Sequence, residues 1–216
     1  MDRNDVVKVA KAYDGVYKGS KKHHEIIDTF NTLKPDGYTA GYNDHWCAEF
    51  VTACFLKAYG KKYASKIMVF SASCGKMQEK AEKFKIWEER DNYKPNIGDV
   101  VLYDWDDNGK GNNKGWPDHV GIVSSVSRSE FYVIEGNTGN NSHVGYRKLK
   151  INNRYIRGFI LPKYKLLPGE KVNKEKINKL ADDVIAGKYG DGDERKKKLG
   201  IYYNEVQKEV NRRLKS

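Results

Sequence analysis

The chain has 216 residues, a formal charge of +11 and a mean hydropathy of -0.81, with 38% hydrophobic and 12% aromatic residues. That content of core-forming side chains excludes a disordered chain. No run approaches the roughly 20 apolar residues of a membrane-spanning helix, so we expect a soluble globular protein without membrane insertion. The charge predicts an acidic partner, and nucleic acid, an anionic membrane surface or an anionic cell-wall polymer would each satisfy it.

The N-terminal segment, MDRNDVVKVAKAYDG, lacks the apolar centre of a secretory signal. We therefore expect synthesis in a host cytoplasm and release by another route, such as lysis. A mature fragment of an exported protein would begin in the same way, so the sequence leaves both routes open.

Periodic apolar residues predict two amphipathic helices, over residues 4–18 and 20–33, and the turn at residues 34–37 ends the second one. A third helix is predicted to begin near Cys47 and to end at Gly60. Its apolar face consists of Val51, Cys54, Phe55 and Ala58.

From residue 99 the pattern changes to short β-rich runs separated by Gly- and Asn-rich loops. These runs cover residues 99–105, 119–126, 131–136 and 155–162. Helices followed by strands indicate an α+β domain over residues 1–165, in which N-terminal helices pack against one antiparallel sheet.

Residues 166–172, which include Pro168 and Gly169, have the composition of a linker. Beyond it, residues 173–216 are charged and periodic, and they predict a small three-helix module with a well-packed core. The apolar stripes of its first and last helices are Ile177, Leu180, Ala181, Val184 and Ile185, and Tyr203, Val206, Val210 and Leu214.

The three cysteines form neither a metal-ligand motif nor an even-numbered disulfide framework. Cys47 lies where a helix begins, and unpaired N–H groups and the helix dipole lower the pKa of a thiol at that position. It is therefore the candidate nucleophile, and the same N–H groups can stabilise an oxyanion. The alternative is a small buried hydrophobe, which is the interpretation that we favour for Cys54 and Cys74.

A nucleophilic cysteine needs a base, and the base needs a group that orients it. His119 opens the run 119–126 and Glu135 lies at the end of the run 131–136, and these positions are neighbours in an antiparallel pair. Asn137 is a second candidate for holding the imidazole or stabilising the oxyanion. A lone histidine at a strand start is otherwise a surface residue or a hydrogen-bonded core residue.

In chain order, WCAEFV, GDVVLYDWD, PDHVGIV and YVIEGNTG resemble the successive signatures of the CHAP family of cysteine amidohydrolases and peptidases. The resemblance implies a papain-like fold with a catalytic group of Cys47, His119, Glu135 and Asn137. It also implies bacterial peptidoglycan as substrate, meaning its glycan strand and stem peptide. The cut would fall between muramic acid and L-alanine, or within the stem peptide or cross-bridge.

Four aromatic residues lie next to these motifs, and either they line a cleft for a glycan or peptide or they belong to the core: Tyr42, Trp46, Trp105 and Trp116. The segment DWDDNGKGNNKG has oxygen donors at short spacing but lacks the final Glu of an EF-hand loop. We expect a solvated loop at Asp106 and Asp107 and assign no metal ligands.

Near the C-terminus, INKLADDVIAGKYGDGDERKKKLG followed by YNEVQKEVNRRL resembles one copy of a short cell-wall-binding repeat of the CW-seven type. The resemblance implies recognition of the muropeptide unit, with Lys188, Asp193 and Arg195 in the loop that would meet the ligand. For any one of these residues, capping or solvating the helices is the simpler interpretation.

The sequence as a whole predicts a phage-type endolysin that hydrolyses a peptidoglycan amide bond through a thioester at Cys47, with no metal or organic cofactor. A cellular autolysin and a non-catalytic wall-binding protein that keeps the fold are the alternatives. Nucleic-acid binding is not expected, because the positive charge is spread along the chain without a recognised motif.

Overall fold

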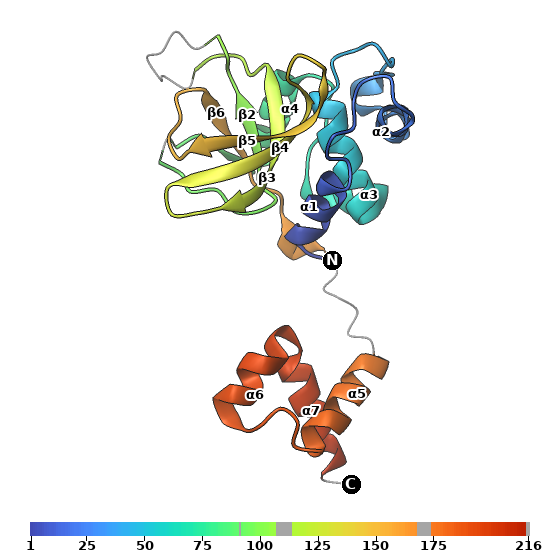
Figure 1. Cartoon of the computed structure of the whole chain (residues 1–216), viewed down its shortest axis with the longest axis vertical. Helices are drawn as coiled ribbons and strands as arrows, with labels where there is room; N and C mark the ends of the chain where they lie inside the picture. Colours follow the sequence, from blue (N-terminus) through green and yellow to red (C-terminus); the bar gives the residue numbers. More distant parts are fainter. Residues whose placement is uncertain (91, 107–113, 168–173, 215–216) are drawn as a thin grey trace. The chain divides into compact units, whose positions relative to one another are not determined.

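The computed structural model describes residues 1–90, 92–106, 114–167 and 174–214 (Figure 1). The chain divides into two compact units, Met1–Leu167 and Pro168–Ser216. Within the described residues, no helix combines the length and the apolar character needed to cross a membrane.

Helices come first in the first unit and strands follow. The helices are α1 (Arg3–Lys11), α2 (Lys21–Asn31), α3 (Cys47–Ile67) and α4 (Cys74–Lys83), with 3-10 turns at Pro35–Gly37 and Tyr164–Leu166. The strands are β1 (Trp87–Glu88), β2 (Val100–Tyr103), β3 (His119–Val126), β4 (Glu130–Thr138), β5 (His143–Lys150) and β6 (Ile156–Ile160). They form one antiparallel sheet in the order β1-β6-β2-β3-β4-β5, which confirms the predicted α+β class.

Several elements differ from the sequence prediction. The first helix ends at Lys11 rather than residue 18, because Gly15 adopts a left-handed φ of 75° and Tyr17 then forms a β-bridge with His143. Helix α3 breaks at Gly60, as predicted, where φ is 69°, but helical turns resume beyond it. Helix α4 and strands β1 and β5 were not predicted from the sequence.

Helix α3 is buried over most of its first half and packs on β3 and β4. Gly136 permits this close approach, since a Cβ atom there would lie 2.5 Å from the Cβ of Phe50 on α3. Figure 1 shows α1, α2 and α3 lying together beside the sheet. The start of α3 is therefore held against the part of β4 that follows Glu135.

The second unit contains α5 (Lys174–Ile185), α6 (Gly192–Leu199), a 3-10 turn at Gly200–Tyr202 and α7 (Tyr203–Arg213). Its small core consists of Ile177, Ala181, Val184, Leu199, Val206 and Val210. Two residues predicted for the apolar stripes are instead exposed, Ile185 by 48% and Leu214 by 70%. Both lie at helix ends, where the opposing helices no longer cover them.

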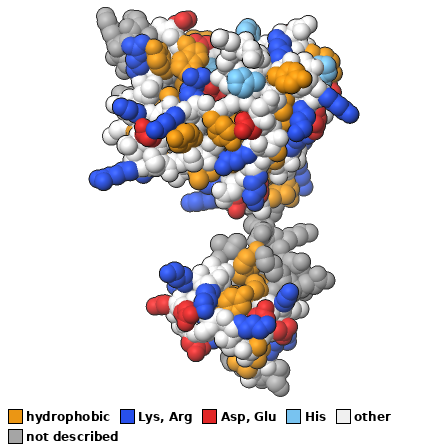
Figure 2. All heavy atoms as spheres, viewed as in Figure 1, with side chains coloured by type: hydrophobic (Ala, Val, Ile, Leu, Met, Phe, Trp, Pro, Cys, Tyr) orange, Lys and Arg blue, Asp and Glu red, His pale blue; other side chains and the backbone are white. Residues whose placement is uncertain are grey.

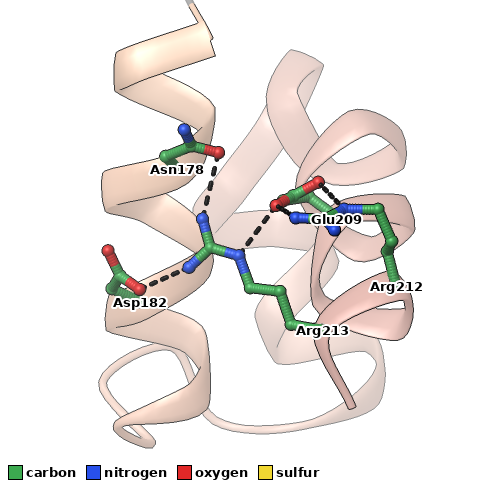
Figure 3. A network of polar contacts seen from close by, with 5 residues as sticks. All are labelled: Asn178, Asp182, Glu209, Arg212 and Arg213. Carbon is green, nitrogen blue, oxygen red and sulfur yellow. Dashed lines mark hydrogen bonds and ion pairs between the residues drawn. The ribbon is translucent and has the colours of Figure 1, made fainter. Parts of the chain in front are cut away.

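Arg213 joins α7 to α5 (Figure 3). Its guanidinium donates to Asn178 Oδ1 at 3.0 Å, pairs with Asp182, and donates through Nε to Glu209 Oε1 at 2.8 Å. Such partly exposed pairs contribute little each, but a shared guanidinium fixes the two helices in register. Figure 2 shows Lys and Arg side chains spread over the visible face of each unit, in line with the diffuse charge of the sequence.

Candidate active site

Cys47 is the first residue of α3, preceded by Trp46 as N-cap. Its thiol is buried and not part of a disulfide. The backbone N–H of Ala48 is among the groups that lower the pKa of this thiol, after the Cys74 thiol and His119. The nucleophile candidate therefore occupies the helix start that the sequence predicted, where orphan N–H groups favour negative charge.

His119 and Glu135 are brought together by the pairing of β3 with β4. His119 Nε2 lies 3.1 Å from Glu135 Oε2, and both side chains are buried. An ionised carboxylate only accepts, so this contact places the ring proton on Nε2 and leaves Nδ1 for Cys47. The two residues thus have the arrangement of a base and the group that orients it.

The electrostatics of the site favour an ion pair. A hydrogen bond from the Cys74 thiol, together with the contact and charge of His119, lowers the pKa of Cys47 well below its usual value, although burial opposes this shift. Burial would lower the pKa of His119, but its contacts with Cys47 and Glu135 outweigh burial and raise the pKa to about 9. At neutral pH the pair is therefore thiolate and imidazolium.

Arg147, on the unpredicted strand β5, completes the charge arrangement. Its Nε donates to Glu135 Oε1 at 2.9 Å and to Oε2 at 3.1 Å, and its guanidinium lies 4.7 Å from the ring centroid of Trp105. Burial raises the pKa of Glu135, but His119 and Arg147 outweigh it, and the net pKa is lowered. The run HVGYRKLK has only a weak alternation of apolar and polar residues, and nothing in the residue type marks Arg147 as part of the site.

Asn137 directly follows β4 residues Glu135 and Gly136, and its side chain contacts Ser142 and His45. Its backbone is left-handed, with φ of 56°, and its Oδ1 accepts from Ser142 Oγ at 2.5 Å while Nδ2 lies 3.3 Å from His45 Nδ1. Among the contacts described for the chain, none joins Asn137 to His119. Its side-chain neighbours come from the segment before α3 and from the turn between β4 and β5.

The four aromatic candidates separate into different environments. Trp46 is completely buried, packs edge-on against Phe50 and donates to Ser142 Oγ at 2.9 Å, so its assignment to a cleft wall is wrong and the core alternative holds. Trp105 stacks on Tyr103 with ring centroids 4.7 Å apart and lies 6.0 Å from the His119 ring.

Trp116 and Tyr42 are exposed, in different surroundings. Trp116 is 61% exposed, and its indole lies so close to Gly75 that a Cβ atom there would come within 1.9 Å of the ring. It therefore covers the residue next to Cys74. Tyr42 stacks on His24 at 3.9 Å and donates to Asp28 Oδ1 at 2.9 Å, on the α2 side of the unit.

A pocket of about 710 Å³ opens beside the start of α3, between residues 36–49 and residues 71–76. Glu49 forms part of its wall, only two residues after Cys47 and 1% exposed. Within the described structure, Glu49 Oε2 has no hydrogen-bond partner. Burial raises the pKa of Glu49 to about 8, and the charge of Cys47 adds to this effect.

No group of three or more metal-ligating side chains occurs in the parts of the chain that the structure describes. Asp106 is an exposed turn residue, whereas Asp107 and most of the loop that follows lie outside the described residues.

In the second unit, two of the three predicted binding residues take part in local contacts. Lys188 pairs with Asp183 at 2.5 Å, and Arg195 donates to the Gly190 carbonyl at 2.8 Å and to Gln207 Oε1 at 3.2 Å. Asp193 lies exposed in the first turn of α6. These contacts hold the segment 186–191 and the start of α6 against the other helices, which fits the simpler interpretation for Lys188 and Arg195.

Comparison with known families gives two matches. Residues 37–137 match the family model of the CHAP domain, and residues 178–214 match that of the CW_7 repeat. No curated protein matches the chain. A CHAP domain followed by a cell-wall-binding repeat supports a peptidoglycan hydrolase, with Cys47, His119 and Glu135 inside the matched catalytic segment.

We predict that Glu49→Gln removes a pH dependence of stability. The unfolded chain releases this proton near the ordinary glutamate pKa of 4.5, whereas the folded chain holds it up to about 8. Between these values the folded state binds more protons, so its stability falls as pH rises, by about 1.4 kcal/mol per pH unit. Thermal unfolding should show equal Tm values near pH 4.5 and a more stable variant at pH 8.

Exposed Glu79→Gln is the matched control for this comparison and should follow the wild type at every pH. A Tm difference between wild type and Glu49→Gln that stays constant from pH 4.5 to 8 would contradict the raised pKa.

We predict that Arg147→Gln shifts the acidic limb of the pH–rate profile on peptidoglycan to higher pH. Without the guanidinium, burial of Glu135 is opposed by His119 alone, and loss of a charge at this distance raises a carboxyl pKa by roughly one to three units. Protonated Glu135 no longer fixes the imidazole. Lysis rates measured from pH 4 to 10 give the midpoint of the acidic limb. The Arg147→Lys variant keeps a positive charge, so its midpoint should lie closer to that of the wild type.

Lys148→Gln is the control. Lys148 is on the same strand but pairs with Glu130, with 2.8 Å between Nζ and Oε2, and it does not contact Glu135 in the described structure. If Arg147→Gln lowers the rate at every pH without moving the acidic limb, Arg147 has only a structural role and the prediction is contradicted.

Proposed function

Because the chain carries a CHAP domain and a CW_7 repeat, we propose that it hydrolyses an amide bond of peptidoglycan through a thioester at Cys47. The bond is either the one between muramic acid and L-alanine or one within the stem peptide or cross-bridge. The observation that carries the proposal is the buried series Cys47, His119 and Glu135, in which the thiol starts a helix and the imidazole is held at 3.1 Å by the carboxylate.

The first half of the reaction forms the thioester. The Cys47 thiolate attacks the amide carbon, and the positive end of α3 stabilises the negative charge that develops on the oxygen. The His119 imidazolium then gives its proton to the nitrogen of the leaving amine, and the C–N bond breaks. Glu135 and Arg147 keep the ring in place and balance its charge throughout.

The second half releases the product. Neutral His119 takes one proton from water, the hydroxide attacks the thioester carbon, and the C–S bond breaks to give the Cys47 thiolate and a carboxylic acid, which releases the second water proton to the solvent. The imidazolium is thereby restored, so the site begins the next cycle in the state that it favours at neutral pH. The proton given to the leaving amine and the proton taken from water both pass through His119.

Substrate contacts are proposed for the exposed and half-buried aromatic residues near the site. Trp116 offers an open face beside Gly75, and Trp105 lies next to the His119 ring under Arg147. An aromatic face of this kind packs against the apolar face of a sugar or a peptide side chain. Tyr42, near α2, would contact a more distant part of the polymer.

For the second unit we propose binding to the muropeptide through the loop with Lys188, Asp193 and Arg195. Attachment to the wall raises the effective concentration of the catalytic domain at its substrate without any new catalytic contact. A net charge of +11 favours association with an anionic wall. We propose a phage-type endolysin that reaches the wall after release, and a cellular autolysin would use the same two modules.

We predict that wild type releases fragments from purified Gram-positive or Gram-negative peptidoglycan and that Cys47→Ala releases none. Mass spectrometry of the fragments, with assay of newly freed amino groups, identifies the scissile bond from its new terminus. Cys54→Ala is the control, because Cys54 is buried on the same helix away from His119, and it should retain activity.

Equal cutting by wild type and Cys47→Ala would refute the assignment of the nucleophile. Binding of both proteins to the wall without cutting by either would support the alternative of a non-catalytic wall-binding protein.

A further inference from the structure

Two helix starts meet at the candidate nucleophile. Cys74 is the first residue of α4, with Ser73 as its N-cap, just as Cys47 is the first residue of α3. Their sulfur atoms lie 4.0 Å apart, and both side chains are buried. From the sequence we favoured a packing role for Cys74, but the fold brings it to Cys47 across a separation of 27 residues.

We infer that Cys74 is the resolving thiol of Cys47, so that oxidation of the nucleophile by a peroxide ends in a reversible Cys47–Cys74 disulfide. Closing the bond requires the sulfur atoms to approach from 4.0 Å to about 2 Å. The disulfide itself depends only on this geometry. Its effect on activity rests on the proposed function.

The two thiols differ in the way that such a pair requires. Contact with Cys47 and burial both raise the pKa of Cys74, so it remains a protonated thiol that donates toward the Cys47 thiolate. Oxidants attack the thiolate first, and a neighbouring thiol then decides whether the product is reversible. Cys54 offers the contrast, since burial raises the pKa of its thiol and it has no sulfur neighbour among the described contacts.

The disulfide would form in two steps, oxidation of Cys47 and attack by Cys74. The Cys47 thiolate attacks one oxygen of hydrogen peroxide, the O–O bond breaks, hydroxide leaves and a sulfenic acid forms, with sulfur losing two electrons. The Cys74 sulfur then attacks the sulfenic sulfur, the S–O bond breaks, and the thiol proton leaves with the hydroxyl as water. A dithiol reductant returns two electrons and two protons and restores both thiols.

The disulfide would have two consequences. It removes the nucleophile, so activity stops while the protein is oxidised. It also protects Cys47 from further oxidation to sulfinic acid, which thiols do not reverse.

The experiment compares four full-length proteins: wild type, Cys74→Ala, Cys74→Ser and Cys54→Ser. Each is treated with hydrogen peroxide, from equimolar to excess. Remaining free thiols are then alkylated, and the protein is digested for mass spectrometry. Wild type and Cys54→Ser should lose about 2 Da and yield a linked peptide pair containing Cys47 and Cys74, and dithiothreitol should restore their full activity. Both Cys74 variants should instead gain oxygen at Cys47 and stay largely inactive after dithiothreitol. Thermal unfolding checks that each variant is folded, and the serine variant serves if the alanine variant is not.

Absence of the linked pair in oxidised wild type, a link to Cys54 or between two molecules, or equal recovery of the Cys74 variants would overturn the inference. A linked pair in a protein that cuts no peptidoglycan would leave the inference standing and refute the proposed function.

Discussion

A completely buried carboxylate must be paired, and the pairing of Glu135 is the constraint on which the site depends. Glu135 is held from one side by His119 and from the other by Arg147, so three neighbouring strands have to be in register for the charge to be tolerated. The same constraint fixes the ring nitrogen that faces Cys47. Correct pairing of these strands therefore also positions the imidazole, and a shift in the register of β5 would disturb both the sheet and the site.

The second constraint is the close contact between α3 and β4. Gly136 lacks the Cβ atom that would strike Phe50, so the helix that carries Cys47 can rest on the strand that carries Glu135. The helix start supplies positive potential, and His119 supplies a proton donor, which together favour the thiolate. Burial opposes this charge, and the neighbouring Cys74 thiol is the additional donor that helps to offset it.

The sequence predicted those site residues whose role follows from their place at the start or end of a helix or strand. Cys47 at a helix start, and His119 and Glu135 at facing strand ends, follow from periodicity and antiparallel pairing, and the structure places them together. Arg147 was missed and Cys74 was interpreted as a packing residue, because their elements, β5 and α4, carry many charged residues and weak patterns, so only tertiary packing brings them to the site. The burial of Trp46 likewise depends on how helices cover the sheet, which local sequence does not specify.

Beside the hydrogen bond from Cys74, the contact with the His119 imidazolium lowers the pKa of Cys47 and favours its thiolate. The most direct measurement is the rate of Cys47 alkylation by iodoacetamide from pH 4 to 10, followed on the Cys47 peptide by mass spectrometry in wild type and His119→Gln. Wild-type Cys47 should react rapidly at pH values well below 8.5, the ordinary cysteine pKa, and the midpoint of the reaction should move to higher pH in the variant. Identical profiles with a midpoint near the ordinary pKa would contradict this effect of His119.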